Sequence, residues 1–251
     1  MMKKIAVLLV LLAASFSLGF FASDFARQGT SGTQQTVVLA PLPEKSLSAS
    51  IDIVAVQAQG QAGVVNTATV EVVPGKGRVL FSLNPFVEPD TQQSAEIAKT
   101  VAEAVTKKSL EGKDLIYSID AGQTQLVGGP SAGAALAIAT IAAIEEKQIK
   151  SNVEITGTIN PDGSIGQIGG VLEKLAACVQ NGKTLFLVPK GQSTLSYYQP
   201  QVTRQERNGF IIERTTYVPK TLDLNEYAKQ QGWNIEIKEV ADIQEAMQYL
   251  F

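Results

Sequence analysis

One stretch of the chain restricts its fold most strongly: the loop Gly128-Gly129-Pro130-Ser131-Ala132-Gly133 and the apolar run that follows it. Residues 134–144 carry no charged side chain and are rich in Ala, a strong helix former. A helix that is apolar on every side has to be buried, so the core must form around it. The loop places the hydroxyl of Ser131 at the start of this helix, where backbone N–H groups lack partners. A hydroxyl in that position serves as a helix cap, a phosphate contact or a nucleophile.

The amino-acid composition excludes several classes of active site. The 251 residues include no histidine, which rules out a Ser-His-Asp triad, a Cys-His pair and the usual zinc enzyme sites. The single cysteine, Cys178, excludes an internal disulfide framework, and we expect it to pack as a small hydrophobic residue. A net charge of −3 without a long basic run argues against a nucleic-acid partner.

Residues 1–26 have the pattern of a targeting segment. Lys3 and Lys4 precede an uncharged run from Ile5 to Ala22, whose length lies between that of a signal-peptide core and that of a spanning helix. Two alternatives follow, a cleaved signal peptide or an N-terminal membrane anchor. With lysines before the run and no positive cluster after it, the remaining chain is predicted to lie outside the cytoplasm. Residues 27–50, rich in Gly, Ser, Thr, Gln and Pro, predict a linker.

Residues 51–251 predict one domain of mixed α and β structure. The elements expected before the serine loop are strands at 51–56 and 67–73, a tight turn at 74–77, a strand at 78–83, a helix at 94–110 and a strand at 115–119. The turn chemistry at 74–77 predicts that its flanking strands form a β-hairpin.

The elements expected after the buried helix are a strand at 153–159, a helix at 171–179, a strand at 184–189, a helix at 224–231, an edge strand at 234–240 and a capped helix from Asp242. The apolar strand, helix and apolar strand between 153 and 189 predict a parallel crossover. Residues 190–222 are polar and predict a loop or hairpin insertion.

Without histidine, a reactive serine needs another base, and Lys174 is the candidate. It lies in the predicted helix at 171–179 among apolar neighbours. Burial disfavours an ammonium group and lowers the pKa of lysine from ~10.4 toward ~7–8, the useful range for a general base. Thr156, at the end of a predicted strand, carries a hydroxyl that could orient the neutral amine. A lysine on a short helix is more often a solvated surface residue, and spacing alone leaves both readings open.

Two blocks of the sequence resemble motifs of the proteolytic domain of the Lon family of Ser-Lys proteases. The segment Gly129-Pro130-Ser131-Ala132-Gly133 resembles the nucleophile motif of that family. Thr156-Gly157, then Gly163 and Ile168-Gly169-Gly170-Val171-Leu172-Glu173-Lys174, resemble its T-G…G…I-G-G-x-x-E-K block. The distances of 25 positions from Ser131 to Thr156 and of 43 to Lys174 are also similar to the family's spacing. The resemblance covers residues 51–251 and is strongest over 117–190.

The resemblance implies a fold in which small mixed sheets pack with helices. It implies that Ser131 is the nucleophile and that Lys174 is the general base, and we expect Thr156 to hold the lysine amine. As a hypothesis, the N–H group of Ser131, together with that of Gly129 or Ala132, binds the oxyanion. It also implies a protein or peptide substrate, no metal or organic cofactor, and a homo-oligomer, typically a hexameric ring. With no ATPase domain in the sequence, we expect an ATP-independent serine endopeptidase that acts outside the cytoplasm, tethered to the membrane or secreted.

The sequence departs from the family pattern in two places. Gly128 stands where an acidic residue commonly lies three positions before the nucleophile, which bears on the shape and charge of the cleft. The insertion at 190–222 is longer than the resemblance leads us to expect. Two other functions stay open: a non-catalytic, membrane-tethered scaffold of the same fold, and a phosphate-binding small-molecule enzyme. The phosphate-loop pattern G-x-x-x-x-G-K-[ST] is absent, and the second alternative gives Lys174 no role.

Overall fold

The computed structural model of the protein describes residues 40–41, 45–57, 62–207 and 210–251. The chain divides into two units, residues 1–38 and 39–251, and only the second contains described residues. The predicted targeting segment and most of the predicted linker therefore lie outside the described residues. Within the described part of the chain, no helix is both long and apolar enough to cross a membrane.

The larger sheet contains four strands in the order β2-β3-β7-β4. These strands are β2 (Leu47–Val56), β3 (Gly63–Pro74), β4 (Val79–Phe81) and β7 (Lys113–Asp120). Along β3, buried Ala68, Val70 and Val72 alternate with more exposed residues, as in a strand with one face on the core. Strand β2 begins at Leu47, so its first four residues lie within the predicted linker. Its polar residues there pair with β3, and the hydroxyls of Ser50 and Thr69 lie 2.8 Å apart.

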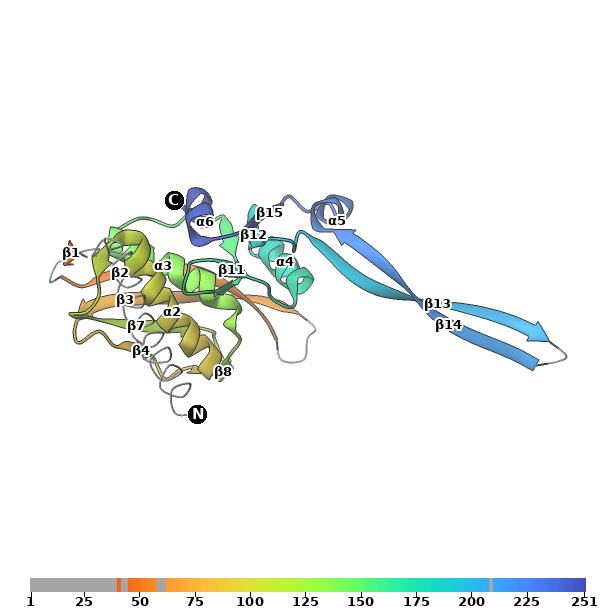
Figure 1. The fold of residues 1–251 in the computed structure, drawn as a ribbon, viewed down its shortest axis with the longest axis horizontal. Helices are drawn as coiled ribbons and strands as arrows, with labels where there is room; N and C mark the ends of the chain where they lie inside the picture. Colours follow the sequence, from red (N-terminus) through yellow and green to blue (C-terminus); the bar gives the residue numbers. More distant parts are fainter. Residues whose placement is uncertain (1–39, 42–44, 58–61, 208–209) are drawn as a thin grey trace, which may run out of the picture. The chain divides into compact units, whose positions relative to one another are not determined.

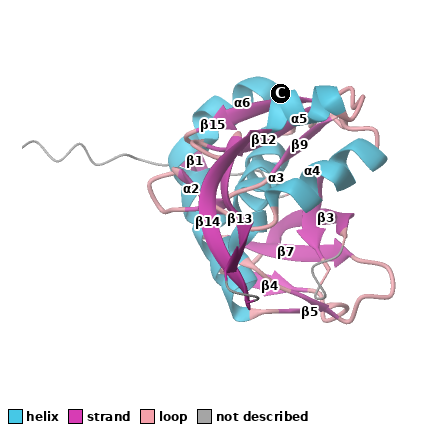
Figure 2. Ribbon diagram, turned by 90° about the vertical axis from the view of Figure 1, so that its right-hand side faces the viewer, coloured by secondary structure: helices cyan, strands magenta, loops and turns pink. Residues whose placement is uncertain are grey.

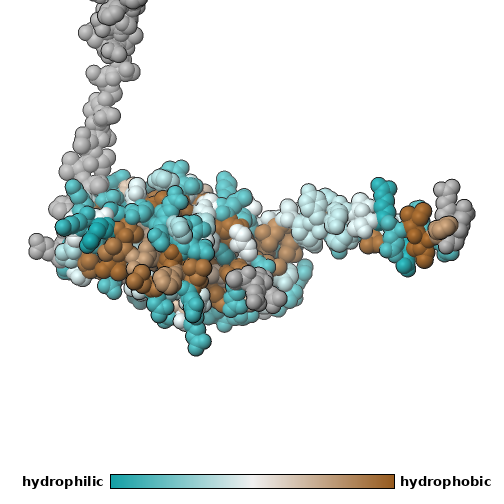
Figure 3. Space-filling view, turned by 90° about the horizontal axis from the view of Figure 1, so that it is seen from below, coloured by the Kyte–Doolittle hydropathy of each residue, from teal (hydrophilic) through white to brown (hydrophobic). Residues whose placement is uncertain are grey.

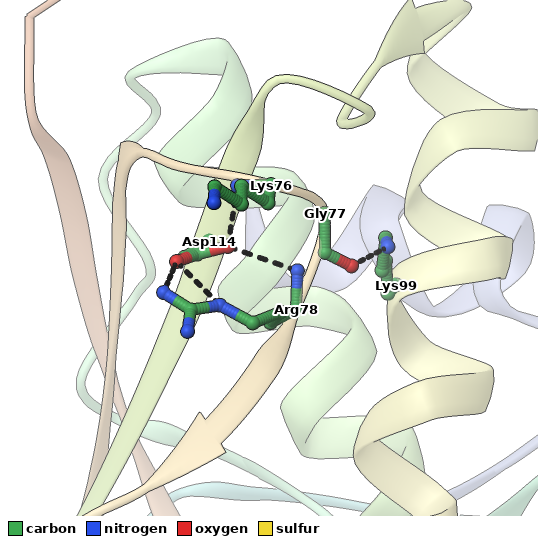
Figure 4. Close-up of polar contacts among 5 residues, drawn as sticks. All are labelled: Lys76, Gly77, Arg78, Lys99 and Asp114. Carbon is green, nitrogen blue, oxygen red and sulfur yellow. Dashed lines mark hydrogen bonds and ion pairs between the residues drawn. The ribbon is translucent and has the colours of Figure 1, made fainter.

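The predicted hairpin between β3 and β4 is wrong, because β7 lies between these two strands and pairs with both. Figure 4 shows the reason at the start of β7. The carboxylate of Asp114 accepts hydrogen bonds from the backbone N–H groups of Lys76 (2.8 Å) and Arg78 (2.9 Å) and forms an ion pair with the Arg78 guanidinium. The N–H of Gly75 also donates to the carbonyl of Gly112 at 2.9 Å. The turn is thus bound to a third strand rather than closing a hairpin.

Two long helices pack together against this sheet. Helix α3 (Gly133–Glu145) is buried along residues 133–144 and contacts α2 (Pro89–Thr106), β2 and β3, as its lack of charge predicts. Helix α2 starts five residues earlier than expected, because Pro89 occupies the first helical position, where its fixed φ and missing N–H are harmless. It ends at Lys107 in a left-handed conformation, before the predicted stop at Gly112.

The second sheet has the order β15-β12-β9 and is parallel throughout. Its strands are β9 (Val153–Ile155), β12 (Leu185–Pro189) and β15 (Glu236–Val240), and helix α4 (Val171–Gln180) connects β9 to β12. The predicted parallel crossover is confirmed, and β15 is the predicted edge strand. The strand expected at 153–159 is interrupted at Thr156 and Gly157, and its last part, β10 (Thr158–Ile159), pairs with β11 (Ile165–Gly166). Figure 2 shows α4 between this sheet and β3, both of which it contacts.

Residues 190–222 contain a long antiparallel hairpin, which confirms the hairpin alternative. Its strands are β13 (Thr194–Arg207) and β14 (Phe210–Asp223), and Figure 1 shows them as a two-stranded ribbon between β12 and helix α5 (Leu224–Gln230). Most of β14 is exposed, including three consecutive apolar residues, Phe210, Ile211 and Ile212. Figure 3 shows apolar surface at this end of the ribbon.

The remaining described elements complete the predicted mixed fold of small sheets packed with helices. Short parallel pairs join β1 (Ala40–Pro41) to β6 (Lys108–Ser109) and β5 (Phe86–Val87) to β8 (Leu126–Val127). The last helix, α6 (Ile243–Leu250), begins as predicted: Asp242 accepts from the N–H of Glu245 at 2.9 Å, and the Glu245 carboxylate accepts from the N–H of Ala241.

Candidate functional site

Ser131 lies in a 3-10 turn, η1 (Pro130–Ala132), directly before α3. Gly129 precedes this turn with φ +99°, a value that residues with a side chain rarely adopt. Two side chains at the start of α2 fix the glycine from both sides. Asp90 accepts its N–H at 3.2 Å, and the Thr91 hydroxyl donates to its carbonyl at 3.0 Å. The position of the serine therefore depends on the packing of α2 against the loop.

The structure brings Ser131 together with the two distant residues that the sequence singled out. The Nζ atom of Lys174, on α4, lies 2.8 Å from Ser131 Oγ and 3.2 Å from Thr156 Oγ1. The hydroxyl of Thr156 in turn donates to the Ser131 carbonyl at 3.2 Å. Lys174 is only 3% exposed, so it is a buried lysine rather than a solvated one.

Burial changes the proton affinity of this lysine. Its removal from water lowers the pKa of Lys174 from 10.5 to about 8, against smaller opposing contributions from Cys178 and Glu154. An amine with this pKa is partly neutral slightly above neutral pH and can accept a proton from a hydroxyl. Cys178, one turn further along α4, is buried, and burial raises the pKa of its thiol, as expected of a packed residue rather than a nucleophile.

An open cavity of about 420 Å³ lies beside the hydroxyl and the amine. Its lining residues are Val56, Gly128, Ser131, Gly169, Gly170, Glu173 and Lys174. Several of these are glycines, which leave room for a substrate backbone close to Ser131 Oγ. The volume lies within the range of small-ligand pockets.

At Gly128 the structure adds an acidic group that the sequence did not reveal. The carboxylate of Glu88, the residue before α2, lies over the glycine, and an ideal Cβ on Gly128 would be only 1.8 Å from Glu88 Oε2. A carboxylate from a distant segment thus occupies the space of a side chain at position 128. Glu88, Asp90 and Thr91 all act through the packing of α2 against the loop, and no sequence motif marks them.

The chemistry available at this site is that of a hydroxyl and a buried amine. Among the described residues, no group of three or more His, Cys, Asp or Glu side chains could hold a metal ion. The backbone N–H of Lys76, in the glycine-rich turn at 74–77, donates to Asp114 at the start of β7 (Figure 4). The arrangement suits proton transfer from Ser131 Oγ to Lys174 Nζ.

Comparison with known proteins gives a family match and several relatives. The family model of the Lon protease (S16) C-terminal proteolytic domain matches residues 52–222. A Lon protease from Phenylobacterium zucineum is 30% identical over 145 residues, or 56% of this chain and 18% of that protein. Lon proteases from Buchnera aphidicola (subsp. Acyrthosiphon pisum) and Escherichia coli K12 are 32% and 29% identical over 131 residues, each 51% of this chain. The chain thus covers less than a fifth of the length of these relatives.

Proposed function

Because this chain belongs to the Lon protease (S16) C-terminal proteolytic domain family, we propose that it is a serine endopeptidase with Ser131 and Lys174 as its catalytic dyad. The observation that carries the proposal is the 2.8 Å contact between Ser131 Oγ and a buried lysine amine. A serine hydroxyl needs a base in hydrogen-bond reach, and Lys174 meets that requirement.

The reaction begins when Ser131 Oγ attacks the carbonyl carbon of the scissile peptide and its proton passes to neutral Lys174. Lys174 then gives this proton to the leaving amine, and the C–N bond breaks to form an acyl-enzyme. A water molecule attacks the ester carbonyl while Lys174 takes its proton, and the return of that proton to Ser131 releases the carboxylic product. No metal or organic cofactor takes part in these steps.

Thr156 sets the direction of the lysine amine. Its own hydrogen is used on the Ser131 carbonyl, so its oxygen presents lone pairs to an N–H of Lys174. The lone pair of the neutral amine is then free to face Ser131 Oγ. Removing the threonine hydroxyl would leave the amine without this constraint.

The oxyanion of the tetrahedral intermediate is bound by backbone N–H groups at the start of α3. Of the candidates, Pro130 has no N–H, and the N–H of Gly129 already donates to Asp90. The proposed donors are therefore the N–H groups of Ser131 and Ala132. A single donor of this kind is worth ~3–4 kcal/mol in the transition state.

The substrate is a protein or peptide, whose backbone fits the glycine-lined cavity beside Ser131. We also propose that hydrolysis needs no ATP, because the dyad requires no nucleotide and the sequence lacks a phosphate-loop pattern. Residues 1–26 act as a signal peptide or membrane anchor, so the domain works outside the cytoplasm. The family relationship supports assembly into a homo-oligomeric, hexameric ring.

Fluorophosphonate labelling and casein cleavage at pH 8–9 test the peptidase proposal. Wild type and a Ser196→Ala control, altered at an exposed serine of the hairpin, should label and cleave, whereas Ser131→Ala should do neither. If folded wild type and Ser131→Ala behave alike, the chain is the non-catalytic scaffold instead. If Lys174→Ala keeps full activity, Ser131 remains the nucleophile but Lys174 is not its general base.

A further inference from the structure

A buried carboxylate lies behind the proposed dyad and takes no direct part in the mechanism. Glu154, in the middle of β9, has a fully buried side chain, and among the described residues neither of its carboxylate oxygens has a hydrogen-bond partner. Its nearest cation is the amine of Lys183, 3.3 Å away. A buried carboxylate without hydrogen bonds is unfavourable unless a cation compensates it.

The position of Glu154 on β9 directs it toward the site. Side chains two residues apart on extended backbone point to the same face, so Glu154 shares a face with Thr156, which the amine of Lys174 contacts. Helix α4 reaches this face through the amine of Lys174, and Cys178 lies one turn further along the helix. The titratable groups near Glu154 are thus Lys174 and Cys178 of α4 and Lys183, which follows α4 in the chain. Asp52 of β2 adds a further carboxylate, which pairs with Lys183.

The charges of these groups indicate that Lys174 is the cation that balances the Glu154 carboxylate. Lys183 is held by Asp52 at 2.6 Å and by the carbonyl of Ser151 at 2.9 Å, so Asp52 already balances its charge. Glu154 and Lys174 remain, and together they are neutral when they hold a single proton between carboxyl and amine. A buried pair of this kind favours the electrically neutral states.

We propose that Glu154 is a positioning residue for the peptidase reaction, in which its carboxylate supplies the counter-charge for the Lys174 ammonium that forms as Ser131 attacks. The proposal rests on the proposed function of Ser131 and Lys174. The Ser131 O–H bond breaks as Oγ bonds to the substrate carbon, and the proton goes to Lys174 Nζ and never to Glu154. The carboxylate acts through space, in surroundings that screen charge weakly.

The electrostatics of the site agree with this geometry. Burial raises the pKa of Glu154 to about 7, so the carboxylate forms in the pH range where Lys174 starts to lose its proton. Its negative charge raises the pKa of Lys174 and opposes the effect of burial. Replacing Glu154 by an uncharged residue should therefore lower the pKa of Lys174 further.

Glu154→Gln tests the proposal because it keeps the shape of the side chain and removes its charge. We expect the midpoint of the pH profile of kcat/KM to fall by about 0.5–1 pH unit. We expect kcat at the plateau to fall about tenfold, because the ammonium loses its counter-charge. Glu154→Asp should restore part of both values, and Asp52→Asn, on the far side of Lys183, should move the midpoint less.

A merely structural role would lower the thermal stability of Glu154→Gln and leave the midpoint unchanged, and that result would overturn the proposal. A midpoint that moves upward would also overturn it. If Glu154→Gln does not fold, the same comparison is made with Glu154→Asp, which should then show a smaller downward shift.

A second readout separates this proposal from the proposed function. The NMR titration of ¹³C-labelled lysine reports the pKa of Lys174 directly in Ser131→Ala protein, whether or not wild type hydrolyses peptides. Removing the Glu154 charge should lower that pKa, and an unchanged value would contradict the role of Glu154. Wild type without Ser131-dependent cleavage would contradict the peptidase function alone.

Discussion

The hydroxyl of Thr156 donates to the backbone carbonyl of Ser131 at 3.2 Å, and its oxygen lies 3.2 Å from the amine of Lys174. One side chain directly after β9 therefore contacts both the loop that carries the serine and the lysine beside it. The N–H of Gly157 adds a second bond to the same carbonyl at 2.9 Å. Strand β9 thus controls the relative position of the two proposed catalytic groups.

Thr156→Val should lower kcat/KM on the order of 10- to 100-fold, because it removes the hydroxyl and keeps the shape of the side chain. The rate of fluorophosphonate labelling at Ser131 should fall in parallel. Thr221→Val, at an exposed position of the hairpin, is the matched control and should behave as wild type. Full activity in Thr156→Val would show that the lysine needs no help from this hydroxyl.

The activity should rise with pH as Lys174 loses its proton. Burial lowers the pKa of Lys174 to about 8, so kcat/KM should increase through that pH and level off above it. Lys174→Arg should be inactive at every pH, because a guanidinium group keeps its proton. Initial rates on a fluorogenic peptide between pH 6 and 10 provide the measurement, and a flat profile would exclude Lys174 as the base.

Lys174→Met should be more stable than wild type near pH 7. The folded protein holds Lys174 with a pKa of about 8 and the unfolded chain with 10.5, so the unfolded chain binds more protons between these values. Wild-type stability then increases with pH from about 8 toward 10.5, and below pH 8 the buried charge costs stability. We expect the free energy of unfolding to rise by about 1–3 kcal/mol in Lys174→Met at pH 7, with no matching gain at pH 9.5.

Urea denaturation of both proteins at pH 7 and pH 9.5 measures this difference. Comparing the variant with wild type cancels the contributions of titrating groups that do not interact with Lys174. The contribution of Glu154 stays in the difference, because loss of the lysine charge raises the pKa of this carboxylate. A Lys174→Met protein that is less stable than wild type at both pH values would contradict the cost of a buried ammonium.

Gly129→Ala should destabilise the serine loop and lower activity. The φ of +99° at this position is strained for a residue with a Cβ, at a cost of about 1–3 kcal/mol. Gly112→Ala is the control, because no atom lies within 4 Å of a Cβ there and its φ is unstrained. Chemical denaturation and Ser131 labelling of the two variants should differ, and equal behaviour would mean that the loop adapts to a side chain.

The sequence predicted those elements whose signals are local. The uncharged run at 134–144 identified α3, and the apolar strands around α4 identified the parallel crossover. The expected hairpin failed because Asp114, far away in the sequence, binds the turn through Lys76 and Arg78. Turn chemistry describes a bend in the chain and does not determine which strands pair on either side of it.

The candidate site shows the same limit. The position of Lys174 in the sequence was also compatible with a surface residue, and only the family resemblance assigned it as the base for Ser131. The structure adds that the amine is buried and in contact with the serine. No sequence motif marks Glu88 and Asp90, because they reach the loop only through the packing of α2. Glu154 could have been noticed in the sequence, since a charged residue between Val153 and Ile155 is unusual in a buried strand.

The proposed dyad draws its serine from the turn before α3 and its lysine from α4, with Thr156 between them at the end of β9. In a partly folded chain in which α4 has not yet packed beside this turn, Ser131 has no base within reach, and the proposed activity is absent. Recovery of activity after dilution from denaturant should therefore lag behind recovery of helical signal. Under the proposed function, peptidase activity therefore appears only after the tertiary structure of the domain has formed.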